Sequence, residues 1–257
     1  MSLVTHDVDG DVATVTIDRS DKLNALNADV FRELEAAFES VEGEARGVVL
    51  RTAGDRAFVA GADIKLFDEL ASQTEFMEFL RLQNRVNDYV AAHPVVVVSA
   101  VDGLAFGGGL ELVLATDMVV AAADAEFGLP EVNLGFVPGG GGTQRLPRVV
   151  GPNKAKEMIV TGNPITAEEG RELGLVNAVV EDGDVEGAAR DLVDDAMANA
   201  PLAVEEALRL VDEGMDASLD AAMRYEQAVT AYLYTTEDNA EGIRAFTEDR
   251  DPEFEGR

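Results

Sequence analysis

The 257-residue sequence contains no cysteine and no tryptophan, and only two histidines. Without cysteine the chain can form no disulfide, no thiol nucleophile and no thiolate metal site. The two histidines, His6 and His93, leave little material for a histidine-based triad or a zinc centre. We therefore expect a protein whose chemistry uses neither a thiol nor a bound metal.

Positive charge is scarce as well. Fifty acidic residues stand against 20 basic ones, of which only four are lysines, and the formal net charge is −30. A field of this sign repels phosphate backbones, so we expect no nucleic-acid partner. Self-repulsion at this level destabilises a fold in dilute buffer, and concentrated salt screens it. The acidic, lysine-poor composition therefore predicts a salt-rich cytoplasm, although an ordinary acidic protein is the simpler alternative.

Long hydrophobic runs are also missing. The sequence has no uncharged apolar run of roughly 18 residues, the length that a membrane-spanning helix needs. The first residues, MSLVTHDVDGD, lack the basic flank and apolar core of a signal peptide. Apolar residues nevertheless make up 47% of the chain, as expected for a globular protein. We expect a cytoplasmic protein with no membrane partner.

Strand and helix patterns alternate in the first two thirds of the chain. Strand-like runs occupy 3–8, 12–17, 46–53, 95–101, 117–123 and the end of 166–180. Helical patterns follow Asn27, which is predicted to cap the helix, span 74–92 before Pro94, and begin the 166–180 segment. Beyond these, helical patterns cover 185–199, 201–213, 218–234 and 238–247. The sequence predicts an α/β core over residues 1–182, followed by a C-terminal helical region over 183–257.

Three segments combine glycine with isolated acids. In AFVAGADIKLF (57–67), a strand turns at Gly61 into a helix near Asp63, and exposed N–H groups at such a turn can stabilise negative charge. Taken alone, a simple strand-to-helix turn is the better interpretation. In GLAFGGGLEL (103–112), glycines precede a helix that carries Glu111, and close packing explains the segment as well as a functional role does.

The third segment is FGLPEVNLGFVPGGGGTQRL (127–146), with Glu131 after a proline and four glycines at 139–142. By itself it fits an anion site or a flexible loop. Together with the first two segments it supplies a second isolated carboxyl, and desolvation can raise the pKa of one such acid while the other stays ionised. Two glycine turns can supply the paired amides of an oxyanion hole. Because no nucleophile stands beside a base, general acid–base catalysis is favoured over covalent catalysis.

In these segments the sequence resembles the crotonase (enoyl-CoA hydratase/isomerase) family, most closely its enoyl-CoA hydratases. The matching stretches are NALN (24–27), AFVAGADIK (57–65), VDGLAFGGGLEL (101–112), FGLPEVNLGFVPGGGGTQRLPRVVG (127–151) and TGNPITAEEGRELGLVNAVV (161–180). The resemblance covers essentially the whole chain. It implies a spiral of stacked ββα units with two roughly perpendicular sheets, followed by helices that build a homotrimer, two of which commonly form a hexamer.

The resemblance also implies a role for each matching residue. The backbone N–H groups of Ala62 and Gly108 match the oxyanion hole, Glu111 the water-activating base and Glu131 the acid at the α-carbon. Gly139 matches a residue whose backbone helps to hold the water and the acyl group. The segments that match the lining of the CoA pocket contain Ala25, Leu26, Ala62, Asp63, Ile64 and Lys65. No metal or prosthetic group is implied, since CoA is part of the acyl-CoA substrate.

The implied activity is reversible syn hydration of a 2-trans-enoyl-CoA to a 3-hydroxyacyl-CoA. Family members that isomerise, hydrolyse thioesters or close rings usually lack or replace one of the two acids. The alternatives are an enoyl-CoA isomerase, a specialised acyl-CoA hydratase or dehydratase (for example for 3-hydroxypropionyl-CoA), and a non-catalytic acyl-CoA-binding protein. Near the C-terminus, Thr230 and Asp249 stand where the family often has an aromatic and a basic residue for the adenosine and phosphates, so Arg250 or Lys65 is the candidate substitute.

Overall fold

The computed structural model describes residues 2–64, 72–181 and 183–257. The strands are β1 Val4–Asp9, β2 Val12–Ile17, β3 Gly47–Thr52, β4 Val96–Val101, β5 Leu104–Phe106, β6 Met118–Ala122, β7 Glu126–Gly128, β8 Ile165–Thr166 and β9 Ala178–Val180. The α-helices are α1 Ala28–Val41, α3 Gln73–Ala91, α4 Gly108–Val113, α5 Gly142–Val150, α6 Pro152–Thr161, α7 Ala167–Glu172, α8 Val185–Met197, α9 Pro201–Asp216, α10 Leu219–Leu233 and α11 Glu237–Glu248. Short 3-10 helices lie at η1 Ser20–Lys22 and η2 Pro130–Leu134.

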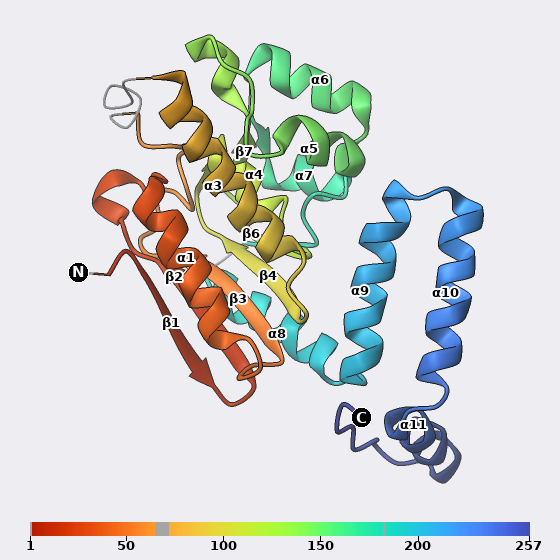
Figure 1. The fold of residues 1–257 in the computed structure, drawn as a ribbon. Coiled ribbons are helices and arrows are strands. Elements are labelled where there is room, and N and C mark those ends of the chain that lie inside the picture. The colour runs from red at the N-terminus through yellow and green to blue at the C-terminus, as the bar shows by residue number, and fades with distance from the viewer. Residues whose placement is uncertain (1, 65–71, 182) are drawn as a thin grey trace.

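The strands form two sheets (Figure 1). The larger sheet has six strands in the order β1-β2-β3-β4-β6-β9, in which β1 and β2 form an antiparallel hairpin and the other neighbours are parallel. The smaller sheet has three strands in the order β5-β7-β8. The predicted α/β core is therefore confirmed. The strand predicted before Gly61 is wrong, because that segment joins neither sheet and forms only an isolated parallel bridge from Val59 to Ala105.

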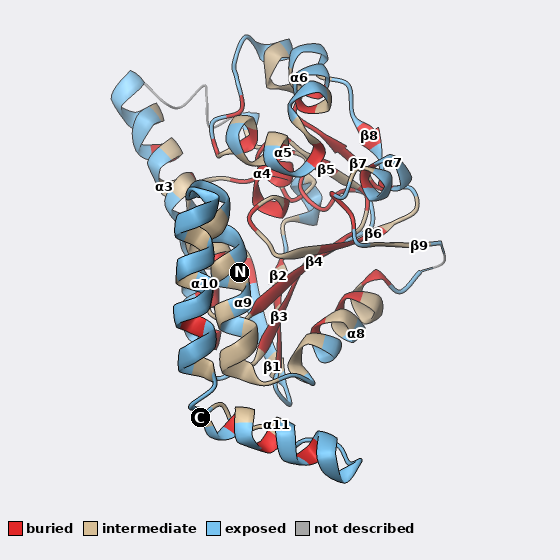
Figure 2. Cartoon of the chain, turned by 90° about the vertical axis from the view of Figure 1, so that its right-hand side faces the viewer, coloured by how far each residue is buried: buried red, intermediate tan, exposed pale blue. Residues whose placement is uncertain are grey.

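Alternating side chains of the large sheet enter two separate apolar layers. Val48 and Leu50 of β3 join the layer that includes α1, whereas Val49 between them joins the layer that includes α8. Figure 2 shows the buried strands β2 to β4 with α8 beside them. Because both faces are covered, these parallel strands are continuous β-branched runs rather than alternating apolar and polar residues. Helix α8 lies in the predicted C-terminal region, yet its buried face completes the core of the sheet.

Local signals explain where α1 and α3 begin. The Asn27 side chain accepts a hydrogen bond from the Val30 N–H at 2.9 Å and so caps α1. Ser72 caps α3 by accepting from the Glu75 N–H at 3.3 Å. Both helices place apolar residues inward, and the Phe31 and Phe79 rings meet edge-on with centroids 5.9 Å apart. This contact docks α3 against α1.

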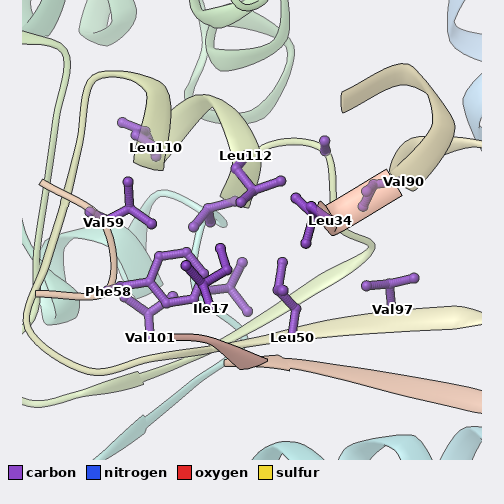
Figure 3. Close-up of a cluster of buried hydrophobic side chains, with 14 of the residues drawn as sticks. Ile17, Leu34, Leu50, Phe58, Val59, Val90, Val97, Val101, Leu110 and Leu112 are labelled. Carbon is purple, nitrogen blue, oxygen red and sulfur yellow. The ribbon is translucent and has the colours of Figure 1, made fainter. Parts of the chain in front are cut away.

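Helix α4 is short and entirely buried. Its Leu110 and Leu112 side chains enter the apolar cluster formed with Ile17 and Phe58 (Figure 3). Glu111 lies between these two leucines in the sequence and faces a different direction. The main core therefore anchors the helix that carries this acid.

Helices α9 and α10 run beside each other, away from the smaller sheet, and α11 follows them near the C-terminus (Figure 1). Several large apolar side chains in this region are exposed: Val211, Met215, Leu219, Met223, Tyr232, Tyr234, Ile243 and Phe246. Phe246 is 91% exposed. Within the described ranges, none of the helices combines the length and apolar character needed to cross a membrane.

Candidate active site

The structure constrains the three glycines at the start of α4 in different ways. Gly107 has φ 53° and ψ −122°, a conformation that side chains disfavour, and its N–H donates to the Gly128 carbonyl at 2.9 Å. A Cβ on Gly109 would lie 2.3 Å from the Val59 carbonyl oxygen. At Gly108 the nearest atoms would be 3.4 Å away, so the fold itself demands glycine least at this position.

The segment before Ala62 runs parallel to β5 and brings a second turn to the start of α4. The Val59 N–H donates to the Leu104 carbonyl at 3.0 Å, and the Phe106 N–H donates to the Val59 carbonyl at 2.9 Å. The Cβ position of Gly108 is 3.9 Å from the Ala62 nitrogen. Among the described residues, neither the Ala62 N–H nor the Gly108 N–H has an acceptor. Two free backbone donors therefore lie close together.

Glu111 is 2% exposed, and protein donors satisfy both of its carboxylate oxygens. Oε1 accepts from the N–H groups of Gly140 at 2.7 Å and Gly142 at 2.9 Å. Oε2 accepts from Gln83 Nε2 at 2.9 Å. Burial raises the pKa of Glu111, while these three hydrogen bonds and the charge of Arg145 oppose that rise. The site thus offers the ionised form of Glu111 a complete set of donors.

Glu131 lies on η2 and faces the same site. A Cβ at Gly107 would be 3.2 Å from Glu131 Oε1, which places this carboxyl beside the start of α4. Glu131 Oε2 is buried and has no hydrogen-bond partner in the described part of the chain. Burial, partly opposed by a backbone hydrogen bond and assisted by the nearby charge of Glu111, raises the pKa of Glu131 to about 7. The two acids therefore differ: donors surround Glu111, whereas the surroundings of Glu131 favour its protonated form.

The glycine loop 139–142 is held by polar side chains of α3. Asn84 Nδ2 donates to the Gly139 carbonyl at 2.8 Å, and Asn87 Nδ2 donates to the Gly140 carbonyl at 3.0 Å. A Cβ on Gly140 would lie 2.0 Å from Gln83 Nε2, so only glycine fits between these groups. Gly139 itself packs against α3, where its Cβ position is 2.9 Å from Leu80 and its carbonyl accepts from Asn84, while the neighbouring Gly140 contacts Glu111.

Sequence reasoning missed Gln83, Asn84 and Asn87. The available signal is that Gln83 and Asn87 stand four residues apart on the buried face of a helix whose other buried positions are apolar. Polar side chains at such positions need hydrogen-bond partners, and here the partners are the Glu111 carboxylate and the Gly140 carbonyl.

The residues expected to line a CoA pocket are brought together where the structure describes them. The Leu26 N–H donates to the Gly61 carbonyl at 2.9 Å, and the Asp63 N–H donates to the Leu26 carbonyl at 2.8 Å. Arg19 links the two segments, because it donates to the Ala25 carbonyl at 2.8 Å and to Asp63 Oδ2 at 2.7 Å.

Three further positions complete the set. Ile64 is 65% exposed next to this junction, and Lys65 lies outside the described residues. Arg250, the other expected cation, forms ion pairs with Glu241 at 2.6 Å and with Glu248 at 2.8 Å. Its guanidinium is thus already held at the C-terminal end of the chain.

Comparison with known proteins shows which family this chain belongs to. A family model described as enoyl-CoA hydratase/isomerase matches residues 7–257. The chain belongs to the enoyl-CoA hydratase/isomerase family. A short-chain-enoyl-CoA hydratase of Clostridium acetobutylicum is 38% identical over 244 residues, covering 94% of this chain and 93% of that protein. A crotonyl-CoA hydratase of Syntrophomonas wolfei is 38% identical over 245 residues, covering 95% of this chain and 94% of the other.

Solved structures agree with this assignment. The crystal structure of an enoyl-CoA hydratase from Bacillus anthracis superposes with a TM-score of 0.95 at 34% identity, and covers 99% of this chain and all of that chain. This family member therefore has the crotonase fold that the sequence resemblance implies. Within residues 2–64, 72–181 and 183–257 there is no group of three or more acidic or histidine side chains placed to hold a metal ion.

Proposed function

We propose that the protein is an enoyl-CoA hydratase that adds water reversibly, in syn fashion, to a 2-trans-enoyl-CoA and gives a 3-hydroxyacyl-CoA. The observation that carries the proposal is the unequal pair of buried acids beside two backbone donors that have no acceptor within the described ranges. Glu111 is surrounded by three donors, and Glu131 has a buried oxygen without a partner among the described residues. Hydration needs one base and one acid at the same time, and this pair offers both.

In the proposed reaction the Ala62 and Gly108 N–H groups bind the thioester oxygen. Glu111 takes a proton from water while the water oxygen forms a bond to the β-carbon. The electrons of the double bond move toward the α-carbon and the thioester oxygen, where the two N–H groups stabilise the enolate charge. Glu131 then gives its proton to the α-carbon. Proton exchange between the two carboxyls and solvent restores the starting state, so no group beyond water and the substrate is needed.

The proposed substrate is an acyl-CoA, held by the junction of residues 25–26 and 62–64. The relatives named as short-chain-enoyl-CoA and crotonyl-CoA hydratases support a four-carbon substrate as the first to test. A backbone donor at an oxyanion hole contributes roughly 10²- to 10³-fold to the rate, which is why both N–H groups need to remain free for the substrate.

The direct test is to add crotonyl-CoA and follow the loss of absorbance of the enoyl thioester, with the product identified by mass spectrometry. We expect a product heavier by one water, and loss of most activity in Glu131→Gln. In a second assay a 3-enoyl-CoA is the substrate. A product whose double bond has moved, with no gain in mass, would identify an isomerase instead. Tight binding of crotonyl-CoA with no conversion would identify a non-catalytic binding protein.

We also propose that the chain assembles into a homotrimer or a hexamer through its C-terminal helices. The support is the set of exposed apolar side chains on α9 to α11, which includes Phe246 at 91% and Tyr234 at 74% exposure. Exposed large apolar side chains in such number on one region of a chain favour a protein interface. Light scattering after size-exclusion chromatography measures the mass, and a monomer would contradict the proposal.

The net charge of −30 supports a further proposal, a salt-rich cytoplasm as the working environment. Surface repulsion is screened within about 3 Å at 1 M salt, compared with about 10 Å at 0.1 M. We expect the melting temperature to rise with KCl concentration up to the molar range. A melting temperature that is flat or falls across this range would mean that the acidic composition is unrelated to salt.

A further inference from the structure

The side-chain amide of Gln83 occupies a central position in the site. Its Nε2 donates to Glu111 Oε2 at 2.9 Å, and both side chains are buried. The same nitrogen would lie 3.4 Å from a Cβ on Gly108 and 2.0 Å from one on Gly140. Gln83 therefore lies between the start of α4 and the glycine loop, and its amide is close to both of these backbone segments as well as to the Glu111 carboxylate.

The backbone beneath Gln83 is held firmly. Phe79, one turn earlier on α3, meets the Phe31 ring of α1 at 5.9 Å. Asn87, one turn later, donates to the Gly140 carbonyl at 3.0 Å. With both neighbouring turns docked, the Gln83 side chain reaches Glu111 from a fixed starting point, and its position does not depend on the glycine loop alone.

The donors around Glu111 divide its two oxygens between different elements. Oε1 is held by two backbone N–H groups of the glycine loop, which constrain one end of the carboxylate. Among the described residues, Gln83 supplies the donor to Oε2. Without it, the carboxylate plane is free to turn about the Oε1 contacts, and a buried anionic oxygen loses its donor.

We propose that Gln83 is a positioning residue that fixes the plane of the Glu111 carboxylate and keeps Glu111 ionised, ready to accept a proton from water. The inference rests on the proposed hydratase function and extends it to a residue on α3. An amide suits this task because it donates a hydrogen bond without adding charge. Glu131, by contrast, has no such donor at its buried Oε2 in the described part of the chain, so the arrangement separates the base from the acid.

Other charged groups also act on Glu111. Arg145 of α5 lowers the pKa of Glu111, and it is itself paired with Asp88 of α3 at 2.8 Å. Glu131 lies on η2, and the charge of Glu111 raises the pKa of Glu131. A test of Gln83 must therefore leave Arg145 and Glu131 unchanged and compare pH profiles rather than a single rate.

The experiment uses the full-length protein with Gln83→Met, which keeps the side-chain length and removes the N–H donor. The matched control is Gln73→Met, the same change at an exposed position on the same helix. The readouts are kcat and KM for crotonyl-CoA across pH, together with thermal unfolding. We expect kcat to fall about tenfold to a hundredfold in Gln83→Met while KM stays within about twofold. The acid limb of kcat/KM should move upward by about one pH unit or more, because the ionised base has lost a donor.

The control should match the wild type in all three readouts. If wild type does not hydrate crotonyl-CoA, the proposed function fails, and this outcome is separate from the role of Gln83. If wild type is active and Gln83→Met keeps its acid limb and its kcat, the positioning role is overturned. A uniform loss of rate without a shift of the acid limb would also overturn it, since packing alone would explain that result. If Gln83→Met does not fold, Gln83→Leu, which also lacks the donor and adds no charge, is measured by the same criteria.

Discussion

Replacement of Glu111 by glutamine separates the catalytic role of this acid from its role in the buried hydrogen-bond network. The new amide oxygen can still accept from the Gly140 and Gly142 N–H groups, which now hold Oε1 at 2.7 and 2.9 Å. The new amide nitrogen would face Gln83 Nε2, but the Gln83 side chain can turn its own oxygen toward it. The hydrogen-bond network therefore survives the change in a neutral form.

The expected magnitudes follow from this network. Three hydrogen bonds to a charged acceptor become bonds to a neutral one, each weaker by about 1 kcal/mol. The variant also avoids the cost of burying a charged carboxylate, several kcal/mol, and this gain offsets the weaker hydrogen bonds. We expect the free energy of unfolding to change by less than about 2 kcal/mol, whereas loss of a general base lowers kcat by about 10²- to 10⁴-fold.

The assay measures hydration of crotonyl-CoA, thermal unfolding, and calorimetric binding of butyryl-CoA, a saturated analogue that cannot be hydrated. Butyryl-CoA should bind the variant as it binds wild type, because the proposed CoA contacts lie at residues 25–26 and 62–64. A kcat within tenfold of wild type would refute the assignment of Glu111 as the base. A collapse of stability would show instead that the buried charge holds the fold.

Three other perturbations test separate parts of the structure. Gly109→Ala places a Cβ 2.3 Å from the Val59 carbonyl and should destabilise the protein by about 1–3 kcal/mol in urea unfolding, whereas Gly214→Ala on exposed α9 should stabilise it by up to about 1 kcal/mol; equal effects would contradict the packing argument. Burial lowers the pKa of His93 below its unfolded value of about 6.5, so the unfolded state binds more protons and stability should fall as pH drops through 6.5. The free energy of unfolding of the His93→Phe variant should decrease less over that pH range. If it depends on pH as steeply as that of the wild type, His93 is not the group responsible. Burial raises the pKa of Glu131 to about 7 and its acid form donates the proton, so kcat/KM should fall as pH rises above about 7, and Glu131→Gln should abolish that alkaline limb together with most of the activity.

The elements with strong local signals were predictable. The valine-rich β4 run and the Asn27 cap of α1 are encoded within a few neighbouring residues, and both are confirmed. The strands β5, β7 and β8 have only two or three residues each, too few for a periodic pattern, and their pairing depends on distant segments. Helix α6 was also missed, since its buried positions are few.

The site was predictable in part. The resemblance pointed to Glu111 and Glu131, and the structure places both at one site. The sequence could not indicate which glycine of the triplet is required for which reason, because Gly109 is constrained by Val59, fifty residues earlier. Gln83 is separated from Glu111 by 28 positions. A hydrogen bond over that separation leaves no pattern in a single sequence, apart from a polar residue on a buried helix face.

The dependence of Glu111 on both α3 and the glycine loop has a consequence for partial unfolding. Helix α3 is docked in the native state by side-chain contacts rather than by strand pairing, and a local opening that breaks these contacts alone costs less free energy than global unfolding. Such an opening removes the Gln83 donor and frees the carbonyls of Gly139 and Gly140 while both sheets stay paired. In urea, enzymatic activity should therefore disappear at a lower concentration than the circular dichroism of the sheets. Catalytic competence then reports on one cooperative unit of the molecule, and the sheets report on another.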